Sequence, residues 1–148
     1  MANRCETPQP GHFRHHMPLQ MRFNDIDMLG HLNNSVYFTF MDLAKTRYFQ
    51  AVLGDKLRWG EIGVVIVNVN CDFCSPTFFD DDIEVETAVI AIGEKSLTLE
   101  QRVYSPSKGD VKCRCVTVMS GFDARTLTSA PITDEWREAI EKYEDKKF

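Results

Sequence analysis

The feature that most constrains the fold is a long helical pattern in the first third of the chain. From Ser35 onward, apolar and aromatic residues recur every three or four positions or lie beside that stripe: Tyr37, Phe40, Met41, Ala44, Tyr48, Phe49 and Val52. This apolar surface is wide, so most of the helix circumference should be buried. Gly54 follows at a position where glycine commonly ends a helix. About twenty residues make a helix roughly 30 Å long, which needs a sheet to wrap around it.

The remaining sequence supplies that sheet. Leu19, Met21 and Phe23 alternate with polar residues, which predicts a short half-buried strand before the helix. Four later stretches have strand character: 63–73, 83–92, 96–104 and 111–122. Their links are short and contain no helical pattern, so neighbouring strands should be antiparallel. Thr133 is a candidate N-cap for a short terminal amphipathic helix. This order of elements predicts an α+β domain with one central helix.

The chain is expected to form one domain. Its 148 residues match a single domain in length. Residues 1–16 show no hydrophobic period, so we expect a flexible tail there and a single folded domain over residues 17–148. Three histidines lie in this tail, but no carboxylate or cysteine partner has ligand spacing, so we predict no metal site there.

Composition excludes several classes of function. A net charge of −5 argues against nucleic acid as the main partner. The most apolar run, residues 62–67, is far shorter than the ~18 residues that a membrane-spanning helix needs. The first sixteen residues contain no apolar core typical of a secretory signal. Five cysteines, in a chain large enough not to need disulfides, lead us to expect reduced thiols and a cytoplasmic protein.

The cysteine spacing raises the possibility of a zinc site. Cys71 and Cys74 are three residues apart, and Cys113 and Cys115 are two apart. However, residues three apart on a strand point to opposite faces, and structural zinc pairs usually lie on tight turns. We therefore expect buried thiols that pack as small hydrophobic groups, with no metal and no redox cofactor.

The polar loop between the first strand and the helix is the candidate site. Asp27 lies where the strand ends, and the next positions carry a glycine, a histidine and two asparagines, namely Gly30, His31, Asn33 and Asn34. A lone aspartate before a helix is commonly a cap or a turn former, and Asp25 fits that interpretation. Asp27 differs because of the polar residues that surround it.

This loop has the groups needed to attack a polarised carbonyl. The backbone N–H groups of Asn33, Asn34 and Ser35 should open the helix without intrahelical partners. A carboxylate that faces such donors can act as base or nucleophile while the donors stabilise negative charge. The residues alone leave three roles open for His31: a general acid or base, a substrate positioner, or a side chain that fixes the backbone.

The segment from Asp25 to Tyr37 resembles the hotdog-fold acyl-thioester hydrolases. The matching residues are Asp25-Ile26-Asp27, Gly30-His31-Leu32-Asn33-Asn34 and Tyr37. The pattern is similar to the 4-hydroxybenzoyl-CoA thioesterase group, and closest to its long-chain acyl-CoA and plant acyl-carrier-protein thioesterase branches. Residues 42–49 continue the match, and weaker similarity extends it over roughly residues 19–125.

The resemblance implies a hotdog fold, in which a five-stranded antiparallel sheet wraps a central helix. It also implies homodimers or homotetramers with an active site completed across a dimer interface. Asp27 would be the general base or nucleophile, the N–H of Asn34 would bind the thioester oxygen, and His31 would match a histidine of the plant enzymes. The asparagine that follows two residues after the aspartate in the plant pattern is Leu29 here, so Asp27 is the best-supported residue.

The function predicted from this resemblance is hydrolysis of an acyl-CoA, in lipid metabolism, to a carboxylic acid and free CoA. The alternatives are an acyl-carrier-protein thioesterase, a hotdog hydratase or dehydratase, and a non-catalytic acyl-CoA binding protein. We expect Asn33, which is also a candidate N-cap of the helix, and Tyr37 to contact substrate. Positive charge concentrates at Lys95, Arg102, Lys108, Lys112 and Arg114. Some of these side chains, Lys95 and Arg102 among them, either hold the CoA phosphates or form a solvated sheet edge.

Overall fold

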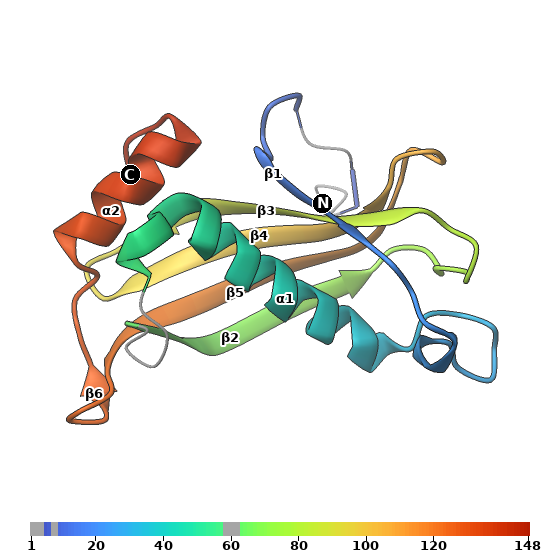
Figure 1. Ribbon diagram of the computed structural model, residues 1–148, viewed down its shortest axis with the longest axis horizontal. Helices are drawn as coiled ribbons and strands as arrows, with labels where there is room; N and C mark the ends of the chain where they lie inside the picture. Colours follow the sequence, from blue (N-terminus) through green and yellow to red (C-terminus); the bar gives the residue numbers. More distant parts are fainter. Residues whose placement is uncertain (1–4, 7–8, 58–62) are drawn as a thin grey trace.

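A long helix lies across one face of a curved antiparallel sheet (Figure 1). The structure, a computed structural model, describes residues 5–6, 9–57 and 63–148. Its elements in chain order are β1 (His15–Leu19), η1 (Phe23–Asp25), α1 (Asn34–Leu53), η2 (Gly54–Lys56), β2 (Val64–Phe73), β3 (Ile83–Ile92), β4 (Ser96–Ser105), β5 (Asp110–Asp123), β6 (Thr128–Ser129) and α2 (Asp134–Glu144). No helix in this described part of the chain has the length and apolarity needed to cross a membrane.

The sheet has the strand order β1-β3-β4-β5-β2, and every pairing is antiparallel. The two-residue strand β6 pairs with β5 outside this path. β1 and β2 are therefore the two edges of the main sheet. The predicted hotdog arrangement is confirmed: a central helix, five main antiparallel strands around it and a short C-terminal helix.

Helix α1 forms as the sequence predicts. It begins after Asn33, whose side-chain oxygen accepts a hydrogen bond from the N–H of Ser35. It ends at Gly54, whose φ of 53° lies in the region that favours glycine. Its buried side chains form the centre of the core: Tyr37, Phe40, Met41, Ala44, Tyr48, Phe49 and Leu53. One face of α1 thus packs into the curve of the sheet. Phe38 and Leu43 on the other face are 40% and 46% exposed, so the prediction that most of the circumference is buried was wrong.

The N-terminal segment differs from the prediction. The first strand spans residues 15–19 rather than 19–23, because its backbone pairs with residues 83–87 of β3. Phe23 is 86% exposed, and it belongs to the short helix η1. The expected flexible tail also ends earlier, since Phe13 is only 7% exposed and its ring lies against the Arg102 guanidinium. Residues 1–4 and 7–8 of that tail lie outside the described residues.

Helix α2 is attached to the core through a buried carboxylate. Glu144 accepts a hydrogen bond of 2.6 Å from the Tyr48 hydroxyl of α1 and one of 3.3 Å from the N–H of Val89 in β3. Burial raises the pKa of the Tyr48 hydroxyl, and the adjacent Glu144 raises it further, so this hydroxyl remains a donor. Ile140 is fully buried beside it. One carboxylate thus joins three elements that are far apart in the sequence.

Gly121 provides a test of packing between β5 and the segment that follows β6. A Cβ atom at Gly121 would overlap the backbone carbonyl of Ala130. We therefore expect Gly121→Ala to reduce the free energy of unfolding by about 2–3 kcal/mol and to lower Tm by roughly 5–10 °C. Differential scanning calorimetry of the purified variant measures this change.

Gly63→Ala is the matched control. Gly63 also lies beside β5, accepting a hydrogen bond from the N–H of Phe122, but a Cβ atom there meets nothing within 4 Å. Its Tm should stay near that of the unmodified protein. Equal losses of Tm in the two variants would contradict the steric explanation.

Candidate active site

The loop from Ile26 to Leu32 closes on itself beside the start of α1. Ile26 and Leu32 form an isolated antiparallel bridge. The N–H of Asp27 donates to the carbonyl of His31 at 2.8 Å, and the N–H of Gly30 donates to the carbonyl of Asp27 at 3.0 Å. Gly30 has a φ of 78°, which allows the chain to reverse direction there. These contacts hold Asp27 close to the helix N-terminus.

The Asp27 carboxylate is half-buried, and the loop fixes its orientation. Its Oδ1 atom accepts hydrogen bonds from the N–H of Leu29 at 2.9 Å and from the N–H of His31 at 3.3 Å. Within the described part of the chain, nothing donates to Oδ2. One oxygen therefore positions the side chain, while the other is available to accept a proton or to attack an electrophile.

The start of α1 leaves one backbone donor available. The N–H of Asn33 donates to the carbonyl of Asp25 at 2.9 Å, and the N–H of Ser35 donates to the side chain of Asn33 at 3.0 Å. The N–H of Asn34 has no acceptor among the described residues. The sequence predicted three available donors, and that number was wrong because the adjacent loop satisfies two of them. Asn34 is the donor that remains for an oxyanion.

The side chains of Asn33 and Asp25 form hydrogen bonds with nearby residues of the chain. The Asn33 side chain caps α1 and also accepts a hydrogen bond of 3.0 Å from the Ser35 hydroxyl. Asp25 is buried, and its Oδ2 accepts a hydrogen bond of 2.8 Å from the N–H of Arg22. The interpretation of Asp25 as a turn-forming residue agrees with this geometry. Asn33 has the capping role that was one of its two predicted roles.

The connection between β2 and β3 supports the loop from the other side. His31 and Phe78 form an isolated bridge, and their rings pack edge to face with centroids 5.1 Å apart. The N–H of Leu32 donates to the carbonyl of Thr77 at 2.8 Å. No described residue offers a hydrogen-bond partner to the His31 ring. Of the three roles considered for His31, fixing the loop is the one that these contacts favour.

Tyr37 is part of the core, and its predicted contact with substrate stays a prediction. It is 3% exposed, and its hydroxyl forms a 2.8 Å hydrogen bond with the Thr77 hydroxyl. Its ring packs against Phe73 of β2. Burial raises the pKa of Tyr37 above its ordinary value. The residue lies one turn into α1 on the inward face, where the sequence pattern already placed other core residues.

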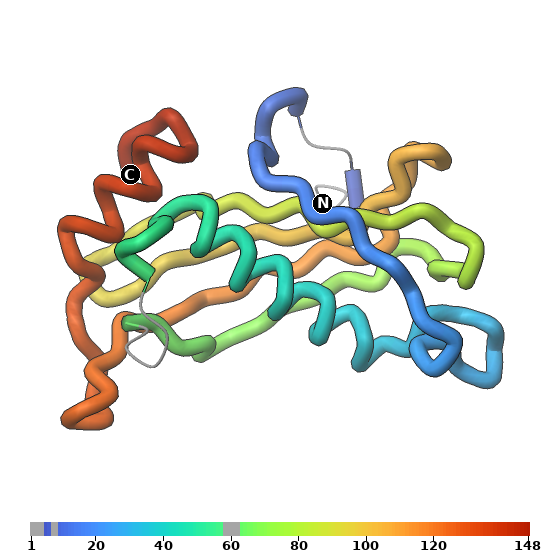
Figure 2. Tube along the Cα trace, viewed as in Figure 1, coloured from blue at the N-terminus to red at the C-terminus, as the bar shows by residue number. Residues whose placement is uncertain are grey.

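The predicted cationic residues do not form one patch, because Lys108 and Lys112 lie at the β2–β3 connection that contacts the loop and the others lie elsewhere. Arg102 is buried and forms an ion pair with Glu86 on the neighbouring strand. Arg114, Lys108 and Lys112 are also paired with carboxylates. Lys95 is exposed in the turn between β3 and β4, which lies at the opposite end of the sheet from the start of α1 (Figure 2). Ion pairs with carboxylates account for four of these five cations, and the predicted contact of Lys95 and Arg102 with substrate stays a prediction.

Sequence reasoning missed a buried ion pair that supports the candidate site. Asp81 lies in the connection between β2 and β3, where its side chain is 3% exposed and pairs with Lys112 at 3.2 Å. Asp81 also accepts a hydrogen bond of 2.9 Å from the N–H of Phe78, and Lys112 donates to the carbonyl of Pro76 at 3.1 Å. This ion pair holds the connection on which His31 rests. Lys112 is distant in sequence, so no local pattern indicated the pairing.

The cysteines also differ from the prediction. The structure joins Cys71 to Cys115 and Cys5 to Cys74 as disulfides, and it leaves Cys113 as a buried thiol. The expectation that all thiols are reduced was wrong for this form of the protein. The pairing follows from the sheet, because Cys71 lies directly opposite Cys115 on the adjacent strand.

Comparison with known proteins places this fold and loop in a family. The sequence model of the thioesterase-like superfamily matches residues 21–140, which include the loop, α1 and the first part of α2. The chain belongs to the thioesterase-like superfamily. Among curated relatives, the long-chain acyl-CoA thioesterase FadM of Escherichia coli is 24% identical over 127 residues, covering 84% of this chain and 95% of its own. The acyl-CoA thioesterase YbgC of Haemophilus influenzae is 26% identical over 106 residues, covering 67% and 78%.

Solved structures of the superfamily agree with this assignment. A Thermus thermophilus thioesterase, crystallised with coenzyme A and zinc, is 28% identical and has a TM-score of 0.82. The match covers 93% of this chain and 98% of that protein. The resemblance to hotdog thioester hydrolases that the loop sequence indicated is therefore confirmed at the level of the superfamily and the fold.

The Asp81–Lys112 ion pair predicts a pH-dependent contribution to stability. Burial opposes ionisation of Asp81, but hydrogen bonds from Lys108, Phe78 and Lys112 outweigh it and lower the pKa of Asp81. A depressed carboxyl pKa stabilises the folded state above the ordinary pKa of aspartate and loses this effect as pH falls through the folded-state pKa. Asp81→Asn should therefore cost about 1–3 kcal/mol near pH 7, and the difference should shrink below about pH 4.

Thermal unfolding of both proteins between pH 7 and pH 3 tests this expectation. Asp80→Asn is the control, because Asp80 is the exposed neighbour in the same turn, and it should leave Tm almost unchanged at every pH. A loss of stability in Asp81→Asn that stays constant down to pH 3 would show that the ionised carboxylate is not responsible.

Proposed function

We propose that this protein is a thioester hydrolase that acts on acyl-CoA. The proposal is carried by two groups at the same loop. One is the half-buried Asp27 carboxylate, which the loop holds in place, and the other is the available N–H of Asn34 at the start of α1. Membership of the thioesterase-like superfamily supports the reaction class. The names of the relatives FadM and YbgC, together with the coenzyme A in the Thermus structure, support the choice of CoA as the thiol carrier.

The proposed reaction consumes one water for each thioester. The carbonyl oxygen of the acyl group accepts a hydrogen bond from Asn34, and the positive end of the α1 dipole adds to the stabilisation of the developing oxyanion. Asp27 either removes a proton from the attacking water or attacks the carbonyl carbon itself. The C–S bond then breaks, the sulfur leaves as CoA thiol, and the acyl group leaves as a carboxylic acid.

Thiol release separates two other activities from this one, and a comparison of the two thiol carriers separates a third. A hotdog hydratase or dehydratase would change the acyl chain and keep the thioester, and a non-catalytic acyl-CoA binder would release no thiol. An acyl-carrier-protein thioesterase would hydrolyse the same acyl group faster on a carrier protein. The net charge of −5 disfavours docking of an acidic carrier protein, so we propose CoA esters as the preferred substrates and lipid metabolism in the cytoplasm as the setting.

Replacement of Asp27 tests the catalytic assignment. Asp27→Asn keeps the shape of the side chain but removes its ability to act as base or nucleophile. We expect kcat to fall by about a hundredfold or more. A thiol reagent that reports free CoA, used with a panel of saturated acyl-CoA substrates of increasing chain length, measures kcat and KM for both proteins.

Asp25→Asn is the matched control for this variant. Asp25 lies two residues away and accepts a hydrogen bond from the N–H of Arg22, which an asparagine side chain can also accept. Its kcat should change much less. Equal losses in the two variants, with both proteins folded by circular dichroism, would contradict the assignment of Asp27.

We also propose that the protein assembles through the β2 edge. β1, the other edge, is a five-residue strand that contains Pro18, whereas β2 has ten residues and no proline. Its exposed apolar side chains are Val65, Ile66, Val67, Val69 and Phe73. An apolar cleft between α1 and β2 continues this surface. A long apolar edge of this kind needs a cover, and a second copy of the chain supplies an identical edge for a two-fold dimer.

A charge on β2 should weaken this assembly. We expect multi-angle light scattering at micromolar concentration to give the mass of a dimer or larger oligomer, and Val67→Lys to shift the distribution towards the monomer. Leu127→Lys is the control, because Leu127 is exposed in the turn between β5 and β6, away from the edge. If the unmodified protein is monomeric and fully active, the proposal is contradicted.

A further inference from the structure

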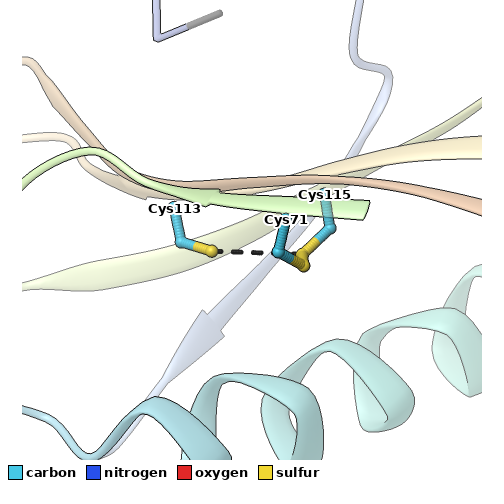
Figure 3. A group of neighbouring side chains, drawn as sticks. All are labelled: Cys71, Cys113 and Cys115. Carbon is cyan, nitrogen blue, oxygen red and sulfur yellow. Dashed lines mark hydrogen bonds between the residues drawn. A yellow bond between two sulfur atoms is a disulfide. The ribbon is translucent and has the colours of Figure 1, made fainter. Parts of the chain in front are cut away.

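Three cysteine side chains meet beneath the first turns of α1. Cys71 comes from β2, and Cys113 and Cys115 come from β5. All three point from the sheet towards α1, and their sulfur atoms lie within 4.8 Å of one another (Figure 3). Cys71 and Cys115 are directly opposite on adjacent antiparallel strands, with Cα atoms 4.2 Å apart, and they form a disulfide.

The two members of this disulfide differ in access. Cys115 is buried in the core, whereas Cys71 is only partly buried and lies on the edge strand β2. The proposed dimer covers this edge, so exchange takes place in the monomer, where a small molecule that reaches the edge of the sheet meets Cys71 first. Thiol–disulfide exchange requires such access to one of the two sulfur atoms.

Cys113 lies beside this pair but is not bonded to it. Its sulfur lies 4.0 Å from that of Cys115. Burial, followed by the nearby Asp72 charge, raises the pKa of the Cys113 thiol to about 12. At neutral pH this thiol stays protonated, and a protonated thiol is a poor nucleophile. The disulfide is therefore protected from internal exchange with its nearest thiol.

We propose that Cys71 and Cys115 form a reversible thiol–disulfide site whose co-reactants are a low-molecular-weight disulfide and the corresponding thiol. In the oxidising direction, the Cys71 thiolate attacks one sulfur of the small disulfide, forms a mixed disulfide and releases the first small thiol. The Cys115 thiolate then attacks the Cys71 sulfur and releases the second small thiol. Two electrons pass from the cysteines to the small disulfide, and the two cysteine protons end on the released thiols.

The site is connected to the proposed catalytic loop by a short chain of contacts. Phe73 follows Cys71 on the same face of β2 and packs on the Tyr37 ring at 5.4 Å. The Tyr37 hydroxyl bonds to the Thr77 side chain, and the Thr77 carbonyl accepts the N–H of Leu32. The disulfide holds β2 against β5 and so fixes the first link of this chain. Reduction should therefore lower activity, a consequence that rests on the proposed thioesterase function.

Thiol counting tests the redox site without any use of activity. The Cys5→Ser/Cys74→Ser double variant removes the second disulfide and leaves three cysteines. After equilibration with an oxidised small disulfide and denaturation under acid quench, alkylation and mass spectrometry should find one free thiol. After equilibration with the reduced thiol they should find three, and the change should reverse on reoxidation.

Two further readouts compare the oxidised and reduced forms of this double variant. The disulfide closes a loop between residues 44 positions apart, so reduction should lower Tm by about 10 °C. Reduction should also lower kcat for acyl-CoA hydrolysis by about fivefold with little change in KM, because it disturbs positioning rather than binding. Adding Cys115→Ser should abolish both responses, whereas adding Cys113→Ala should preserve them.

Two results would overturn the redox site, and a third would overturn its coupling to the catalytic loop. The first is three free thiols in the protein under oxidising conditions. The second is one zinc or copper ion per chain held by the three sulfurs, measured by elemental analysis, because the cluster would then be a metal site. The third is identical kcat in the two forms, which removes the coupling. A chain that cycles between one and three thiols but hydrolyses no acyl-CoA would contradict the proposed function and leave the redox site standing.

Discussion

The structure depends on the burial of α1 in the curve of the sheet. The helix presents one aromatic and aliphatic face, and the antiparallel strands cover that face. This packing fixes where the helix begins, and therefore where its unpaired amides lie. The loop that carries Asp27 is then attached to the helix start through Asn33 and to the β2–β3 connection through Leu32. A large apolar contact thus positions a small polar site.

Local chemistry explains what could be predicted from the sequence. The helical period of α1, its Asn33 cap and Gly54 end, and the alternation of the later strands depend on neighbouring residues, and all of them appear in the structure. The position of Asp27 beside the helix start also follows from sequence proximity. The superfamily could be recognised from the same short segment, because the loop and the start of the helix are consecutive in the chain.

Contacts between distant segments explain what could not be predicted. β1 lies four residues earlier than its alternating pattern indicated, because pairing with β3 selects the residues that become strand. Arg102 and Lys112 looked like surface charges, and their partners Glu86 and Asp81 are recognisable only once the strands are placed side by side. The cysteines illustrate the same limit: spacing suggested Cys71 with Cys74, whereas strand register brings Cys71 to Cys115.

The Tyr48–Glu144 hydrogen bond has a consequence for biosynthesis. The two residues are 96 positions apart, so the ribosome makes Glu144 roughly 5–20 seconds after Tyr48 at ordinary rates of translation. During that interval the helix α1 exists without the partner of its buried hydroxyl and without the cover of α2. The nascent chain therefore passes through a period in which its most aromatic segment is exposed, and that period is when a chaperone would find it.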